Sequence, residues 1–145
     1  MKNIFGYGIL AAATGAFALV AVPSAHAHGD MVPQAVDTSD LPDIGEEWLE
    51  ENPYTGHERA IEIGASAYNQ NCARCHGLDA LSGGIAPDLR YLEVGAEGDS
   101  WYIYRFKEGS SHEGRVYMPA FGQDLGQKAG WAIRAYLETQ IPDDI

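Results

Sequence analysis

The chain contains 145 residues and carries 21 Asp and Glu against 9 Lys and Arg, which gives a formal net charge of −12 at pH 7. This acidic balance argues against nucleic acid and anionic membrane surfaces as partners, because both attract basic proteins. It suits a basic patch on another protein, although carboxylates that only keep the surface soluble would give the same balance. The length supports one domain with one core.

The first 27 residues have the order of features that is typical of a secretory signal peptide. Lys2 supplies a positive charge, an apolar run covers residues 4–22, and the small-x-small triplet 25–27 follows. A membrane anchor is the alternative, because the apolar run approaches the ~17–25 residues that span a bilayer. We expect cleavage after Ala27, export to the periplasm and no membrane span in the mature chain.

Residues 28–56 are expected to form an acidic, extended N-terminal arm that precedes a main domain of residues 57–145. Ten of the 21 acidic residues lie between Asp30 and Glu62, and prolines interrupt this part of the chain. One short helical turn is expected near Glu46 to Glu50. Apolar side chains should hold the arm against the main domain: Trp48, Leu49 and Tyr54.

The two cysteines of the chain lie in the sequence Cys72-Ala73-Arg74-Cys75-His76. A disulfide or a thioredoxin-like redox centre would use such a pair in an exported protein. The adjacent histidine, however, completes C-x-x-C-H, the attachment sequence for c-type haem. Two thiols on one helical turn reach the two vinyl groups of one porphyrin edge, and the imidazole that follows points at the iron. A structural zinc site would need four ligands, and no second cysteine pair exists. We therefore expect one covalently attached haem c.

Met118 is the candidate for the second axial ligand of the iron. It is the only methionine of the main domain and stands in Val116-Tyr117-Met118-Pro119-Ala120-Phe121. Pro119 stiffens the loop that must hold a weakly bound thioether, which as a soft ligand favours ferrous iron. Two alternatives stay open: Met118 as an ordinary core residue, and His112, in the polar loop 108–114, as the ligand.

Three helices are expected in the main domain. Residues 57–71 carry apolar side chains at three- and four-residue intervals, on the face that leads to Cys72. Residues 99–109 begin at good capping residues, end at glycine and are rich in aromatic side chains. Residues 126–139 form the last helix. Gly64 costs about 1 kcal/mol relative to Ala inside the first helix, which a close crossing with the last helix would explain.

A glycine- and proline-rich loop, residues 77–90, links the cysteine motif to the aromatic helix. Loops of this length often contact a cofactor. We expect the Pro87 carbonyl to accept the proton of the unligated His76 nitrogen and so fix the tautomer. Arg90 and Trp101 are candidate partners of the haem propionates. A plain surface charge at Arg90 and simple packing at Trp101 are the alternatives.

Residues 57–145 contain a set of motifs that occur together: Gly64-x3-Tyr68-x3-Cys72, the segment Cys72 to His76, Pro87-Asp88-Leu89, Met118-Pro119 and Ala135-Tyr136-Leu137. On these motifs the segment resembles a class I cytochrome c. The resemblance implies an all-α fold with three to five helices around one covalently attached haem, with His76 and Met118 as axial ligands.

A narrower resemblance covers most of the mature chain. The segments that carry it are Val36-Asp37-Thr38, Glu46-Glu47-Trp48, Asn52-Pro53-Tyr54, residues 64–71 and residues 82–90. In these segments the chain is similar to soluble periplasmic cytochromes that accept electrons from alcohol dehydrogenases containing pyrroloquinoline quinone (PQQ).

This resemblance implies a monomeric electron carrier rather than an enzyme. The electron donor would be an ethanol- or methanol-type quinoprotein alcohol dehydrogenase, and the acceptor a terminal oxidase or another cytochrome. Two alternatives remain: a general periplasmic carrier for another donor, and a haem enzyme or gas sensor with an open sixth iron position. The Met118-Pro119 context speaks against the second.

Overall fold

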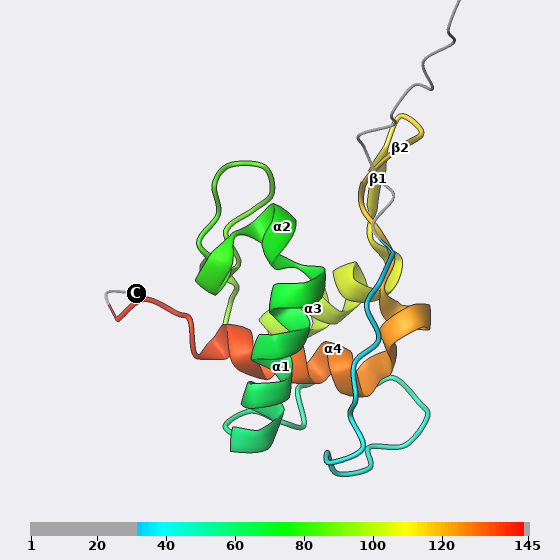
Figure 1. Ribbon diagram of the computed structural model, residues 1–145, viewed down its shortest axis with the longest axis vertical. Coiled ribbons are helices and arrows are strands. Elements are labelled where there is room, and N and C mark those ends of the chain that lie inside the picture. Colours follow the sequence, from blue (N-terminus) through cyan, green and yellow to red (C-terminus); the bar gives the residue numbers. More distant parts are fainter. Residues whose placement is uncertain (1–31, 144–145) are drawn as a thin grey trace, which may run out of the picture.

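The computed structural model describes residues 32–143, so the expected signal peptide and the first residues of the arm lie outside the described residues. The described part is mostly helical, with one two-stranded antiparallel sheet (Figure 1). Within it, no helix is long and apolar enough to cross a membrane. In chain order the elements are α1 Glu58–Asn71, α2 Ala73–His76, η1 Leu78–Ala80, η2 Leu89–Tyr91, α3 Ala96–Glu108, β1 Ser110–His112, β2 Arg115–Met118 and α4 Gly122–Glu138.

The helix boundaries follow local capping chemistry. His57 precedes α1, and its side chain accepts a hydrogen bond from the backbone N–H of Ala60 at 3.2 Å. α3 begins at Ala96, three residues before the expected start, and ends at the expected glycine, Gly109, which has φ 68°. α4 begins at Gly122, before the expected start at Gly126, and Gly126 itself is non-helical with φ 73° and ψ 169°, so the regular part of the helix follows it.

The expected polar loop at residues 108–114 is wrong, because this segment contributes to a β-hairpin. β1 and β2 are joined by Glu113 and Gly114, which have φ values of 50° and 76°. Two successive residues with positive φ give the tight turn whose twist matches that of paired strands. The hairpin projects from the helical body beside α3, and residues 111–117 are exposed (Figure 1).

The core forms where α1 crosses α4. At the crossing, a Cβ atom on Gly64 would overlap the carbonyl group of Ala132. This confirms the expected close crossing, since only a residue without a side chain permits it. Tyr68 and Trp131 are completely buried nearby, and α3 covers the same core with Phe106.

The arm packs against the helical domain as an irregular strap. The Tyr54 side chain is buried, and its hydroxyl donates to the Pro42 carbonyl at 2.7 Å. The expected helical turn near Glu46 to Glu50 is absent. In its place, the side-chain amide of Gln127 donates to the carbonyls of Gly45 and Glu47 at 2.7 and 2.9 Å, and so holds the chain in an irregular course across α4.

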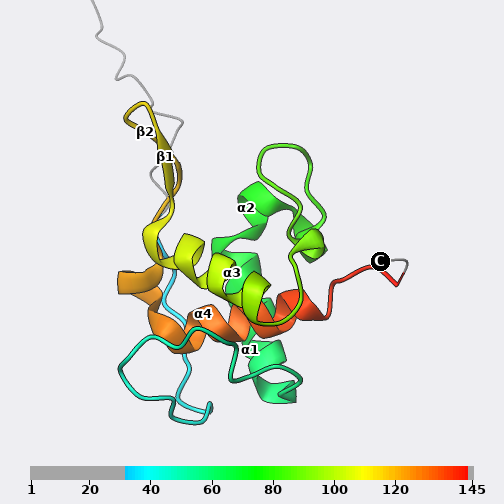
Figure 2. The same ribbon diagram turned by 180° about the vertical axis from the view of Figure 1, so that it is seen from behind.

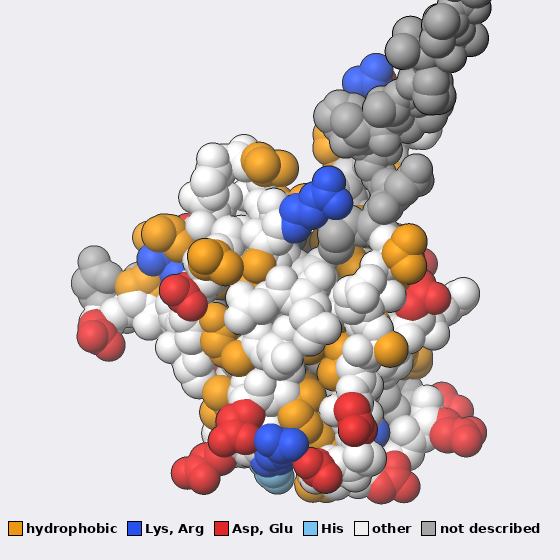
Figure 3. All heavy atoms as spheres, in the orientation of Figure 1, with side chains coloured by type: hydrophobic (Ala, Val, Ile, Leu, Met, Phe, Trp, Pro, Cys, Tyr) orange, Lys and Arg blue, Asp and Glu red, His pale blue; other side chains and the backbone are white. Residues whose placement is uncertain are grey.

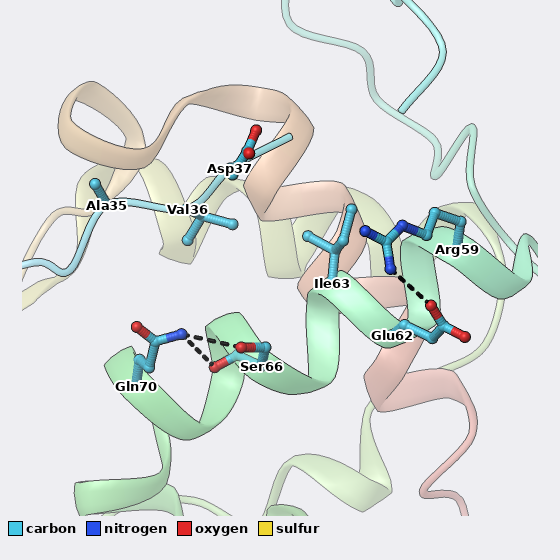
Figure 4. A pocket seen from close by; sticks show the side chains of 8 residues that line it. All are labelled: Ala35, Val36, Asp37, Arg59, Glu62, Ile63, Ser66 and Gln70. Carbon is cyan, nitrogen blue, oxygen red and sulfur yellow. Dashed lines mark hydrogen bonds and ion pairs between the residues drawn. The ribbon is translucent and has the colours of Figure 1, made fainter. Parts of the chain in front are cut away.

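The first part of the arm runs along α1. Figure 4 shows residues 35–37 opposite one face of that helix, with a pocket between the two segments. The backbone N–H of Gln34 donates to the side-chain oxygen of Asn71 at 2.7 Å, and the Asn71 amide returns a bond to the Gln34 carbonyl at 3.2 Å. The arm is therefore tied to the last residue of α1, next to the cysteine motif.

The later part of the arm lies far from that motif. In both Figures 1 and 2, residues 40–57 occupy the end of the molecule opposite α2 and the β-hairpin. Figure 3 shows Asp and Glu side chains gathered at this same end on the face in view. The acidic surface and the cysteine motif are thus at opposite ends.

Candidate functional site

Cys72 and Cys75 lie on one turn of backbone at the junction of α1 and α2. The N–H of Cys72 donates to the Tyr68 carbonyl at 2.7 Å, and the N–H of His76 donates to the Cys72 carbonyl at 3.0 Å. Both cysteines are free and half-buried. This arrangement presents two sulfur atoms and one imidazole from five consecutive residues.

Cys72 lacks the environment of a reactive thiol. A reactive cysteine sits near positive charge or a helix N-terminus, which lowers its pKa. Cys72 follows the C-terminal end of α1 and precedes the four-residue α2, and burial raises the pKa of its thiol to about 12. A helix precedes the motif, where a thioredoxin-like fold would have a strand. The geometry therefore favours the haem-attachment interpretation over the redox-thiol one.

His76 is buried, with 9% of its surface exposed. Its Nδ1 atom lies 2.8 Å from the carbonyl oxygen of Pro87, the contact that the sequence predicted. Since a carbonyl only accepts, Nδ1 carries the proton and Nε2 keeps its lone pair for a metal. Burial lowers the pKa of His76, which favours the neutral form that a metal requires.

Short-range bonds fix the loop that carries Pro87. The backbone N–H of Ser82 donates to the Asp88 carboxylate at 3.3 Å, and the Ser82 hydroxyl donates to the Ala86 carbonyl. Asp88 also caps η2 by accepting from the backbone N–H of Arg90 at 3.1 Å. These contacts close residues 82–90 into a compact loop and determine where the Pro87 carbonyl stands.

Arg90 pairs with Asp88 through Nε at 3.0 Å and Nη2 at 2.8 Å. The guanidinium is half-buried and also lies over the Tyr91 ring, 5.6 Å from its centroid. This ion pair lowers the pKa of Asp88 to about 2. The expected propionate contact of Arg90 stays a prediction.

Trp101 lies on the outer side of α3 and is 48% exposed. The Arg105 guanidinium stands over its ring at 5.4 Å, and Trp101 shares a small surface pocket with Tyr91. Arg90 and Trp101 are thus both neighbours of Tyr91. The donation of the indole to a propionate also stays a prediction.

Met118 ends β2 and is half-buried against the core. The rival ligand, His112, is exposed at the end of β1. In Figures 1 and 2, α2 and the hairpin lie apart from each other at the same end of the molecule. His76 and Met118 therefore belong to two separate segments at this end, and ligation of iron by Met118 stays a prediction.

This donor set fits a c-type haem. It offers two thiols one turn apart, a neutral imidazole held through Nδ1, and a thioether on a separate segment. Among the described residues, no three or more His, Cys, Asp or Glu side chains cluster as a zinc-type site would require.

Comparison with known proteins identifies the family of the chain. Residues 59–137 match the family described as cytochrome C oxidase, cbb3-type, subunit III. The chain belongs to the c-type cytochrome family, which carries haem and transports electrons.

Over 122 residues the chain is 57% identical to the Pseudomonas aeruginosa protein named cytochrome c550, an alignment that covers 81% of this chain and 84% of that one. Two Pseudomonas putida proteins match over short stretches. Quinohemoprotein alcohol dehydrogenase ADH-IIG is 54% identical over 33 residues, and ADH IIB is 42% identical over 38. These stretches cover 23% and 26% of this chain but only 5% and 6% of the dehydrogenases. No solved structure matches significantly.

Proposed function

We propose that the chain is an exported one-electron carrier with a single haem c, attached through Cys72 and Cys75 and ligated by His76 and Met118. The observation that carries the proposal is the 2.8 Å contact between His76 Nδ1 and the Pro87 carbonyl, beside two thiols on the same helical turn. Haem iron supplies a reversible one-electron change between its ferric and ferrous states. Each of these four residues then has a distinct role.

The thiols anchor the group at the end of α1, and the Pro87 carbonyl orients the imidazole. Met118, from the other side, supplies a thioether that favours the ferrous state. Two protein ligands leave no open iron position for a substrate, which supports an electron carrier over a haem enzyme or gas sensor. Carbon monoxide distinguishes an electron carrier from a haem enzyme or gas sensor. An open sixth iron position in the reduced protein would bind carbon monoxide at once and shift the absorption spectrum.

Covalent attachment has a direct test. The purified protein should keep its haem on a denaturing gel, and the Cys72→Ala/Cys75→Ala double variant should lose it. The double variant should also yield little folded protein, because binding of a structural metal group is coupled to folding. A stable, helical double variant without haem would contradict the expected coupling of folding to haem attachment.

We further propose that the electron donor is a PQQ-dependent alcohol dehydrogenase of the ethanol or methanol type. An oxidase or another cytochrome would be the acceptor, and the monomer would work in the periplasm after cleavage at Ala27. Support comes from the similarity to cytochrome c550 and from the short matches to quinohemoprotein alcohol dehydrogenases.

Stopped-flow reduction of the haem by purified quinoprotein dehydrogenases, each supplied with its alcohol, tests this pairing. We expect second-order reduction that requires both enzyme and alcohol. The matched control is a c-type cytochrome of similar charge from an unrelated pathway. Equal rates for both cytochromes would leave a general carrier for another donor as the better description.

A further inference from the structure

The last turn of α3 lies against the segment that carries Met118. Gly109, directly after α3, has φ 68° and donates its N–H to the Arg105 carbonyl at 2.8 Å. A Cβ atom at Gly109 would overlap the carbonyl oxygen of Met118 and stand 2.8 Å from the carbonyl carbon of Pro119. It would also stand 2.9 Å from the backbone nitrogen of Ala120. Only glycine at position 109 therefore allows the backbone of residues 118–120 to come this close to the end of α3.

Two further contacts hold the same segment. The backbone N–H of Phe121 donates to the Phe106 carbonyl at 2.9 Å. The two aromatic rings stack with centroids 6.1 Å apart and an interplanar angle of 24°. Phe121 is 3% exposed and Phe106 2%, so this contact belongs to the core. On the other side, Met118 is the register partner of Ser110, the residue that follows Gly109.

We propose that Gly109 and the Phe106–Phe121 contact position the Met118 thioether at the haem. This inference rests on the proposed function, which makes Met118 an axial ligand. A thioether binds iron weakly, so its occupancy depends on how firmly the protein holds the ligand in place. The hairpin cannot supply that hold alone, because an isolated two-stranded hairpin is marginally stable in water. The end of α3, which is anchored in the core, supplies it.

Gly109→Ala in the holoprotein tests the proposal. A methyl group at Gly109 should push the backbone of residues 118–120 away from α3. We expect the weak long-wavelength absorption of sulfur-ligated ferric haem to be lost or reduced. We also expect the midpoint potential to fall, because loss of the thioether removes its preference for ferrous iron. A purely structural role would lower the melting temperature and leave both signals unchanged.

Two glycines provide matched controls. Gly114 has φ +76° and Gly56 has φ +72°, yet a Cβ atom at either position meets nothing within 4 Å. Gly114→Ala and Gly56→Ala thus introduce the same backbone strain without the contact to residues 118–120. Both should keep the absorption and the potential of the wild type. If the absorption and the potential of these control variants change as those of Gly109→Ala do, generic backbone strain is the cause and the proposal fails.

A second variant covers the case in which Gly109→Ala does not fold. Phe121→Leu keeps an apolar core residue and removes the ring stacking on Phe106, so it should weaken the same absorption. A folded Gly109→Ala or Phe121→Leu protein with unchanged absorption and potential overturns the positioning role alone. A wild-type protein that lacks the absorption, or a Met118→Ala variant that keeps it, overturns the ligand assignment and this inference with it.

Discussion

The Nδ1 atom of His76 lies 2.8 Å from the carbonyl oxygen of Pro87, although the two residues are eleven positions apart. Asp88, next to Pro87, accepts hydrogen bonds from the backbone N–H groups of Ser82 and Arg90. These hydrogen bonds hold the loop that places the Pro87 carbonyl beside His76. The orientation of the imidazole therefore depends on a surface loop, and through that loop on one carboxylate.

Acid should loosen this loop. The Arg90 side chain, as the main cause, lowers the pKa of Asp88 from its ordinary value of 3.8 to about 2. A carboxylate whose pKa is lower in the folded state stabilises the fold above its unfolded pKa, and this stabilisation is lost as the pH falls toward about 2. Asp88→Asn should therefore be less stable than the wild type at pH 7, with a shallower loss of stability in acid. Urea unfolding at several pH values measures both. Arg90→Gln should flatten the acid dependence in the same way, and an unchanged profile in both variants would contradict the prediction.

Met118→Ala should abolish the sulfur–iron absorption of the oxidised protein. The substitution removes the thioether but leaves Pro119 and the contacts of α3 in place, so the fold should survive. The midpoint potential should fall, since the ligand that favours ferrous iron is gone. Visible spectroscopy and redox titration provide the measurements. Persistence of the band would mean that a sulfur atom other than that of Met118 ligates the iron, and it would contradict the assignment.

Gly64→Ala should destabilise the protein although alanine is the better helix former. Helix propensity alone would stabilise α1 by about 1 kcal/mol. The added methyl group, however, would meet the Ala132 carbonyl in the backbone of α4. Overpacking of this kind costs about 1–3 kcal/mol or more, so the net effect should be a loss. Thermal unfolding checks the sign. Gly83→Ala, where a Cβ meets nothing within 4 Å, should be nearly neutral.

Asp99→Ala should free part of the arm. Asp99 and Arg134 form a buried ion pair at 2.7 Å, with side chains 5% and 1% exposed. The second carboxylate oxygen of Asp99 accepts from the backbone N–H of Asn52 in the arm at 2.9 Å. Loss of one partner of a buried pair typically costs about 3–5 kcal/mol. Limited proteolysis of the folded variant should cut near residues 46–51 faster than in the wild type.

A double variant provides the control for that experiment. Asp99→Ala with Arg134→Met removes both charges of this pair, and it also removes the ion-pair partner that Glu138 has in Arg134 at 3.6 Å. It should be more stable than the sum of the single variants predicts. Strict additivity of the two losses would show that the pair is not coupled.

Charge reversal in the arm should affect electron transfer only at low salt. The acidic residues of the arm lie at the end of the molecule opposite α2 and the hairpin, so they act on a docked partner over a long distance (Figures 1 and 3). The Debye length falls from about 10 Å at 0.1 M salt to about 3 Å at 1 M. Joint reversal should slow haem reduction at low ionic strength and flatten its salt dependence. The residues to reverse are Asp43, Glu46, Glu47, Glu50 and Glu51. If the rate and its salt dependence stay the same while the haem spectrum is intact, these acids contribute only solubility and packing.

The sequence alone determined the features that depend on short separations along the chain. Cys72, Cys75 and His76 fall within five residues, so their spacing on one helical turn could be read directly. The start of α1 at the His57 cap and the end of α3 at Gly109 also follow from local chemistry. Gly64 indicated a close crossing because a glycine inside a helix needs a reason.

The tertiary structure alone decided the features whose partners are distant in sequence. Gly109 appeared only as a helix end, because its contact with residues 118–120 forms when the chain returns after a hairpin. The Glu113-Gly114 turn was a local signal for that hairpin, but a two-residue turn without strongly apolar flanks is weak evidence. Asp99 and Arg134 are 35 positions apart, and nothing in either residue's neighbours predicts a buried pair. Burial and long-range pairing depend on how helices cross, and the side chains of the whole core determine that together.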